Sequence, residues 1–224
     1  MPSAPALPHR HVPHVPGLGD PLSPVWDAIP SFPPFLRSGG GGPALQQTRL
    51  RVAWDGEALF VRFDCKDRDA WGTFMRRDDP LYEEEAVEVF LAVGTADPVE
   101  YFEFEVSPLG VLWDGRIHNP TSRRQDLVSD KSWDCPGIHW AAGKGGAHQD
   151  WWAFLSIPWR GVCTLDPGAP FPRLWRANFY RIERPRDGAE PEFSAWSPTF
   201  ATPPDFHQPA RFGVLELAGG SRSR

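Results

Sequence analysis

The chain has 224 residues, with 29 Asp and Glu against 23 Lys and Arg, and a formal net charge of −6. This balance lacks the basic footprint of nucleic-acid-binding domains, so we expect no nucleic-acid partner. The 26 Pro and 21 Gly argue against a helical bundle and favour short strands joined by turns.

The two ends of the chain differ in composition from its middle. Residues 1–23 are rich in Pro and His and lack the continuous apolar run of a secretion signal, so they predict a flexible N-terminal arm. Residues 218–224 predict a polar tail. Residues 24–217 contain no linker that would divide them, so we expect a single domain there.

The compartment is not fixed by the sequence. No signal peptide is visible, and the 3 Cys cannot all pair within the chain, so the cytoplasm is the default expectation. No stretch is long and apolar enough to span a bilayer, so we expect no membrane partner.

The first predicted strands lie over residues 49–54 and 59–65, where apolar and polar side chains alternate. Between them stands Asp55-Gly56, a dipeptide typical of two-residue hairpin turns. The pattern predicts an antiparallel hairpin.

Further strands follow along the chain, with no convincing helical period between them. Residues 80–87 could form one or two helical turns at most. The remaining predicted strands cover residues 87–93, 101–106, 111–117, 151–157, 175–180 and 212–217. Many antiparallel strands without helices predict an all-β sandwich or barrel.

Polar side chains occupy the second face of several predicted central strands. They are Glu88, Glu103, Glu105, Arg176, Asn178 and Tyr180. If these strands are neighbours, the face combines acceptors and donors that could bind sugar hydroxyls, and an acid beside Arg176 would hold the guanidinium in place. The alternative is an ordinary solvated sheet face with paired charges.

Two Trp residues stand out in loops. Trp71 lies in the polar loop between Cys65 and Val87, and Trp196 lies in a turn-like Ala-Trp-Ser-Pro context. Exposed indoles can stack on the apolar faces of sugar rings, although such residues can also plug the ends of a sandwich.

Paired carboxylates raise the question of catalysis. Glu103 and Glu105, two residues apart on one strand face, would be roughly 7 Å apart, a separation that glycosidases use. Alternating acids are common on solvated strands, and no nucleophile, zinc or phosphate motif is present, so we expect no enzyme and no metal centre. Loop acids including Asp67 and Asp69 could hold a structural Ca²⁺.

Several segments together resemble the family 9 carbohydrate-binding modules and their DOMON-like relatives. Residues 84–91 read EEAVEVFL, 101–106 YFEFEV, 195–199 AWSPT and 206–213 FHQPARFG. The resemblance implies a jelly-roll-like antiparallel β-sandwich that grips a terminal sugar between two Trp without catalysis, with structural Ca²⁺ in some members.

By position, the resemblance implies that Trp71 and Trp196 form the clamp. It also implies that Glu85, Glu88, Arg176 and Asn178 supply the polar contacts. The expected partner is a mono- or oligosaccharide or a glycan chain end. Two alternatives stay open: a DOMON-like haem or redox module, with Met75 and His118 or His139 as axial ligands, and a structural or interaction domain with a degenerate sugar site.

Overall fold

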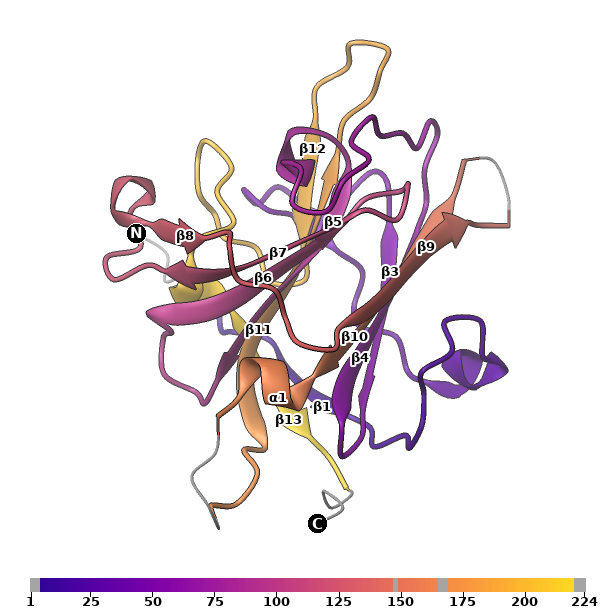
Figure 1. Ribbon diagram of the computed structural model, residues 1–224. Coiled ribbons are helices and arrows are strands. Elements are labelled where there is room, and N and C mark those ends of the chain that lie inside the picture. Colours follow the sequence, from indigo (N-terminus) through magenta and orange to yellow (C-terminus); the bar gives the residue numbers. More distant parts are fainter. Residues whose placement is uncertain (1–4, 147–148, 165–168, 220–224) are drawn as a thin grey trace.

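The predicted antiparallel β-sandwich is confirmed by the computed structural model, which describes residues 5–146, 149–164 and 169–219. A larger and a smaller sheet pack face to face, and helices are limited to single short turns (Figure 1). No helix in the described ranges is long and apolar enough to cross a membrane.

The strands follow one another along the whole chain. They are β1 (His9–Val12), β2 (Leu36–Arg37), β3 (Thr48–Trp54), β4 (Ala58–Cys65), β5 (Ala86–Val93), β6 (Glu100–Val106), β7 (Leu112–His118), β8 (Val128–Asp130), β9 (His139–Lys144), β10 (Trp151–Pro158), β11 (Leu174–Glu183), β12 (Glu192–Ala195) and β13 (Gly213–Leu217). The helical turns are α1 (Trp159–Val162) and the 3₁₀ helices η1 (Pro24–Ala28), η2 (Leu81–Glu83), η3 (Arg124–Asp126) and η4 (Pro209–Arg211).

Strands that are far apart in the sequence pair with one another to form the two sheets. The larger sheet runs β1-β13-β11-β5-β6-β7-β8, with β12 and β2 attached beside β11, and the smaller sheet runs β3-β4-β10-β9. The pairs are antiparallel except β1 with β13. The predicted hairpin is β3 and β4, and the Asp55 carboxylate accepts hydrogen bonds from the backbone N–H groups of Glu57 and Ala58 in the turn.

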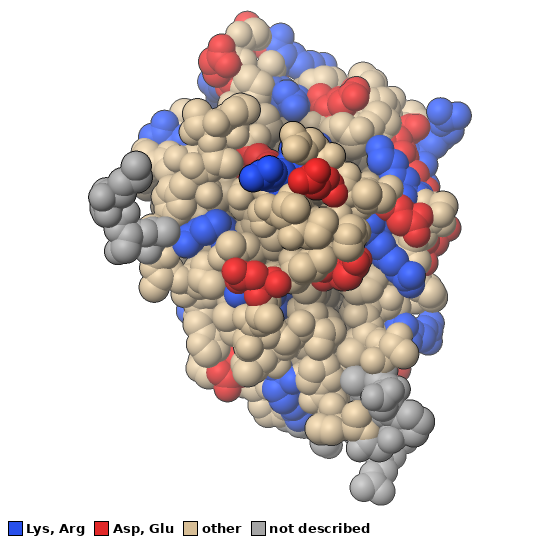
Figure 2. All heavy atoms as spheres, turned by 90° about the vertical axis from the view of Figure 1, so that its left-hand side faces the viewer, with Lys and Arg blue, Asp and Glu red and all other residues tan. Residues whose placement is uncertain are grey.

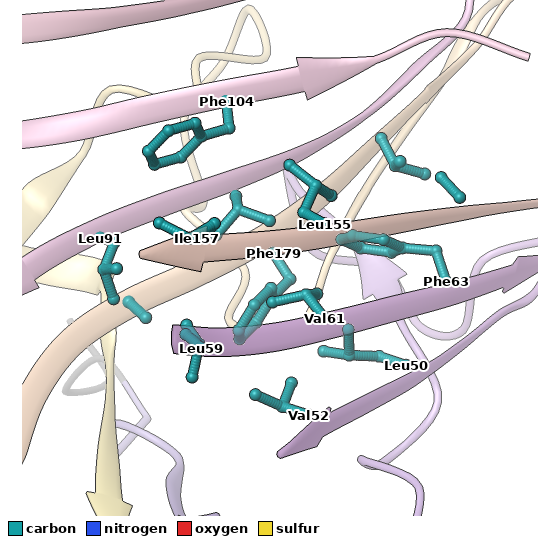
Figure 3. Packing of buried hydrophobic residues seen from close by; sticks show 14 of the residues in the cluster. Leu50, Val52, Leu59, Val61, Phe63, Leu91, Phe104, Leu155, Ile157 and Phe179 are labelled. Carbon is teal, nitrogen blue, oxygen red and sulfur yellow. The ribbon is translucent and has the colours of Figure 1, made fainter. Parts of the chain in front are cut away.

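The main core lies between the sheets, because each strand directs alternate apolar side chains inward. Figure 3 shows part of this cluster: Leu50, Val52, Leu59, Val61, Phe63, Leu91, Phe104, Leu155, Ile157 and Phe179. Each is fully buried. Burying such a side chain contributes about 1.5–3 kcal/mol, so this interface is the main source of stability.

The larger sheet has a second buried face. The segment that leads from β12 to β13 lies over it and brings Phe206 and Phe212 against Phe90, Tyr101 and Tyr180 of the sheet. Central strands of this sheet are therefore covered on both sides, and any polar residue on them is enclosed.

The expectation of a flexible arm over residues 1–23 is wrong for the described part, residues 5–23. Strand β1 pairs in parallel with β13, and the buried Val12 accepts a hydrogen bond from the backbone N–H of Ala218. The following segment packs Leu18 and Trp26 on the outer face of the smaller sheet. Of the predicted tail, residues 220–224 lie outside the described residues.

Charges are mixed on the surface. On the face shown in Figure 2, Lys and Arg alternate with Asp and Glu over a mainly uncharged surface. That face therefore presents no extended field of one sign.

Candidate functional site

A row of four side chains crosses the second face of the larger sheet. Tyr180 on β11 pairs in register with Glu88 on β5, Glu88 with Glu105 on β6, and Glu105 with Trp113 on β7. Because alternate residues share a face, Glu103 lies on the same side, one step along β6. The sheet thus gathers three carboxyl groups next to an indole.

These carboxyl groups form the floor of a pocket of about 1020 Å³. Tyr82 and Phe193 contribute aromatic walls, and the segment from Ala201 to Gln208 forms another side. The remaining lining residues are Trp113, Ile117, Arg124, Leu127, Ser129, Lys131, Ile182 and Arg184. An apolar enclosure with a few convergent polar groups is the usual form of a small-molecule site.

The floor carboxyls are buried with few partners. Glu88, Glu103 and Glu105 are at most 5% exposed, and no described side chain forms a hydrogen bond or ion pair with them. A backbone hydrogen bond from Tyr82 to Glu105 and the charges of Arg124 and Lys131 offset the effect of burial only in part. Burial raises the pKa of Glu88 well above its usual range, with the Glu103 charge adding to the effect. Burial likewise raises the pKa of Glu103 to about 8, and burial together with the charges of Glu88 and Glu103 raises that of Glu105.

Unpartnered donors face the same pocket. The indole N–H of Trp113 and the hydroxyl of Ser129 are buried and lack a partner among the described residues, as do both Glu105 oxygens. A buried polar atom without a hydrogen bond costs roughly 1–3 kcal/mol. A ligand with hydroxyl groups could satisfy all of them.

Gly115 makes room for the Trp113 ring. A Cβ atom at this glycine would lie 2.8 Å from the indole, closer than real Cβ contacts allow. The glycine therefore lets the ring lie flat along β7 beside Glu105, its cross-strand partner.

The covering segment is held in place by its own bonds. The Phe206 ring stacks on Tyr180 at 4.1 Å, and the Tyr180 hydroxyl donates to the Phe206 carbonyl. His207 Nδ1 lies 2.8 Å from the Tyr101 hydroxyl. Burial lowers the pKa of His207 to about 3, so the imidazole stays neutral.

Not all predicted polar residues reach this pocket. Glu88 and Glu103 line it, and Tyr180 adjoins it under Phe206. Arg176 lies further along β11, where it bonds to the carbonyls of Thr95 and Pro209 and pairs with Asp97. An acid does hold this guanidinium, but away from the pocket, so the expected grouping of Arg176 with Glu88 is wrong.

Asn178 has a structural role instead of a place in the lining. Its amide donates to the Tyr180 hydroxyl and the Ser197 carbonyl, and its oxygen accepts from the Ser197 N–H. These bonds attach the turn around residue 197 to β11, and they leave no group directed at the pocket.

The expectation of a Trp71–Trp196 clamp is wrong. Trp196 is only 4% exposed and packs against Phe32 and Phe179 in the main core. Trp71 is half-buried, donates its indole N–H to the Arg184 carbonyl at 2.6 Å, and does not line the pocket. Trp196 thus follows the alternative in which a loop indole closes the core.

Glu85 belongs to a different group of acids. Immediately before β5, it directs its carboxyl away from the pocket, into a cluster with Asp67, Asp69 and Glu183 whose oxygens lie within 4.8 Å of one another. Burial, then the Asp67 charge, raises the pKa of Glu85 to about 9, and a hydrogen bond with the Asp67 side chain adds to the rise.

This cluster fits a hard cation. Its ligand atoms are carboxyl oxygens, which Ca²⁺ prefers, and Glu85 is fully buried among them. The guanidinium of Arg181 lies 2.6 Å from Asp67 and supplies one positive charge, which leaves the four acids incompletely neutralised.

The axial pair expected for a haem module is not brought together. Met75 is 74% exposed in its loop, whereas His118 pairs with Glu100 at the far end of β6 and β7. His139 is exposed at the start of β9. These positions do not converge on one pocket.

Known sequences and structures provide the remaining comparison. A family model described as Carbohydrate-binding family 9 matches residues 42–217. A protein of Arthroderma benhamiae named "Extracellular protein" is 27% identical over 179 residues, which cover 76% of this chain and 77% of that protein.

Solved structures share the fold. A Bacteroides uniformis protein, described as a candidate carbohydrate-binding protein, aligns with a TM-score of 0.72 and 18% identity, over 94% of this chain and 99% of that one. A family 9 module of Caldicellulosiruptor kristjanssonii, solved with cellotriose and with glucose, aligns at TM-scores of 0.65 and 0.64 and 14% identity. These alignments cover 96% and 97% of this chain, and 95% and 99% of the others.

Proposed function

Because this chain belongs to carbohydrate-binding family 9, we propose that the pocket over Glu88, Glu103 and Glu105 binds a saccharide without cleaving it. The ligand is a mono- or oligosaccharide or the end of a glycan chain. The family module from Caldicellulosiruptor kristjanssonii, solved with glucose and cellotriose, supports this class of ligand.

One observation carries the proposal: Glu105 and the Trp113 N–H are buried side by side without partners at the pocket floor. A sugar hydroxyl can accept from the indole and donate to the carboxyl at the same time. Such a ligand gives both unsatisfied groups a hydrogen bond. Removing that energetic cost of the free protein strengthens binding.

Aromatic stacking in this proposal differs from a two-Trp clamp. Tyr82, Phe193 and Phe206 all line the pocket. Their rings offer apolar contact to the C–H groups of a sugar, and the narrower phenyl and phenol surfaces favour a single terminal ring.

The state of the carboxyls supports binding over hydrolysis. A glycosidase needs one protonated and one ionised carboxyl across the scissile bond. Here burial raises the pKa of all three floor acids, so none is set apart as an ionised nucleophile or base. Hydrogen bonding to hydroxyls requires no such division.

Isothermal titration calorimetry with glucose and cellotriose tests the proposal. We expect both to bind, and Trp113→Phe and Glu105→Gln each to weaken binding at least tenfold. Glu85→Gln is the matched control, because it makes the same change at a buried acid outside the pocket. Equal loss in the control, or full affinity in both pocket variants, would contradict this site.

A further inference from the structure

The pocket floor is rich in acceptors and poor in positive charge. Three carboxyl groups, with six oxygens in total, meet there, and none has a hydrogen-bond donor among the described side chains. Natural proteins pair buried carboxylates with cations or donors, because desolvating them alone is costly. This floor is therefore incomplete without a ligand.

Basic residues of the rim do not complete it. Arg124 is two-thirds exposed and lies 3.7 Å from Asp205, and Lys131 places its ammonium 5.6 Å from the centre of the Tyr82 ring. Arg184 donates to the Tyr82 carbonyl and lies over Phe193. Arg124 and Lys131 lower the pKa of Glu103 through their charges, but none of the three forms a hydrogen bond or ion pair with a floor carboxyl.

Donors without partners border the floor carboxyls. Trp113, Ser129 and Arg184 each keep an N–H or O–H group without a partner among the described residues. Hydroxyl groups of a sugar can accept from these donors while another part of the ligand meets the carboxyls. The carboxyl groups therefore require donors from a ligand, whereas these N–H and O–H groups require acceptors.

We infer that the saccharide bound here carries a free amine, and that the pocket selects an amino sugar over a neutral hexose. This inference rests on the proposed function. An ammonium group supplies three donors, no acceptor and one positive charge, which is what the floor lacks. Hydrogen bonds between ammonium and carboxylate are also about twice as strong as neutral ones.

Proton release gives a signature specific to this mode of binding. Because the pKa of each floor acid is raised, the free pocket holds protons near pH 7. An ammonium group arriving at the floor favours a carboxylate, so one carboxyl O–H bond breaks and its proton passes to buffer. The other charged or titratable groups facing this floor are Tyr82, Arg124, Lys131, Arg184, Asp205 and His207.

Three probes separate the possibilities: glucosamine, N-acetylglucosamine and glucose, titrated into the whole chain with EDTA present. We expect glucosamine to bind at least tenfold more tightly than the other two. Its binding heat should depend on the ionisation enthalpy of the buffer, with about one proton released at pH 7. Glucose should release none.

Variants add a second readout. Glu105→Gln keeps the size of the side chain but removes its charge, so glucosamine should lose its preference while glucose binding changes less. Glu85→Gln should leave the preference intact. Equal or tighter binding of glucose, or glucosamine binding without proton release, would overturn the amino-sugar inference and leave saccharide binding standing. No binding of any sugar, cellotriose included, would overturn both.

Discussion

Glu88 and Glu105 face each other directly across β5 and β6, and no described side chain forms a hydrogen bond or ion pair with either carboxyl. Like-charged side chains in this position destabilise a sheet. Here both groups are also buried, which favours their protonated forms and raises the pKa of each. The sheet therefore contains a destabilising pair of carboxyl groups at a position where a bound ligand could form hydrogen bonds with them.

The floor acids should make stability depend on pH. The unfolded chain releases the Glu103 proton near pH 4.5, whereas the folded chain keeps it up to about pH 8. The folded state thus binds more protons across this window, and stability falls as pH rises, by roughly 1 kcal/mol per pH unit. Urea unfolding at pH 5, 6, 7 and 8 measures the slope.

Glu103→Gln should make that slope shallower, since the amide does not titrate, while Glu88 and Glu105 still contribute to it. The exposed Glu83→Gln is the control and should keep the wild-type slope. A wild-type stability that rises between pH 5 and pH 8 would show that the floor carboxyls are ionised in the folded protein.

Trp196 should matter for folding. Its ring fills the core between Phe32 and Phe179, so Trp196→Ala should lower the free energy of unfolding by about 3–5 kcal/mol. Trp71→Ala, at a half-buried position, should cost less. Denaturant unfolding of both variants decides the order. If the folded Trp196→Phe protein loses sugar binding while keeping its stability, the indole contacts ligand after all.

Gly115→Ala should weaken sugar binding without unfolding the chain. The added methyl group would press on the Trp113 ring, displace its N–H from the floor and lower affinity about fivefold or more. Gly19→Ala is the control, because nothing lies within 4 Å of a Cβ there. Calorimetry with the same sugar compares them, and unchanged affinity in Gly115→Ala would separate Trp113 from the site.

We also propose that Asp67, Asp69, Glu85 and Glu183 hold a Ca²⁺ ion that stabilises the fold. At 100 times its dissociation constant, a bound ion adds roughly 2.7 kcal/mol to stability. Thermal unfolding in Ca²⁺ against EDTA should show a higher Tm with Ca²⁺, and Glu85→Gln should remove the difference. The same Tm in both buffers for the wild-type chain would reject the ion.

The sequence was sufficient for the sandwich and for the floor of the pocket. Alternation along β5 and β6 identifies Glu88, Glu103 and Glu105 as one face, and the Asp55-Gly56 turn fixes the register of the first hairpin. Both features are local. They depend on the alternation of apolar and polar side chains and on the residues of a turn, both of which can be recognised within one short segment.

Other features of the fold and site depend on contacts between segments that are far apart in the sequence, so no single segment predicts them. Trp196 is buried because Phe32, far away in sequence, packs on it, and β1 is a strand because β13 pairs with it. Alternation also predicts which face of the sheet Arg176 lies on. It does not give the register between β11 and β5, which places Arg176 opposite Ala92 and away from Glu88. Trp113 could have been found as the residue expected opposite Glu105, had β6 and β7 been paired residue by residue.

The most direct test of saccharide binding in this pocket is the indole N–H signal of Trp113 in a ¹H–¹⁵N spectrum, assigned by its loss in Trp113→Phe. On titration with glucosamine, and with cellotriose, this signal should shift progressively and saturate as the N–H gains a hydrogen bond. A Trp113 signal that stays fixed while calorimetry records sugar binding would place the ligand elsewhere on the molecule and contradict the site described above.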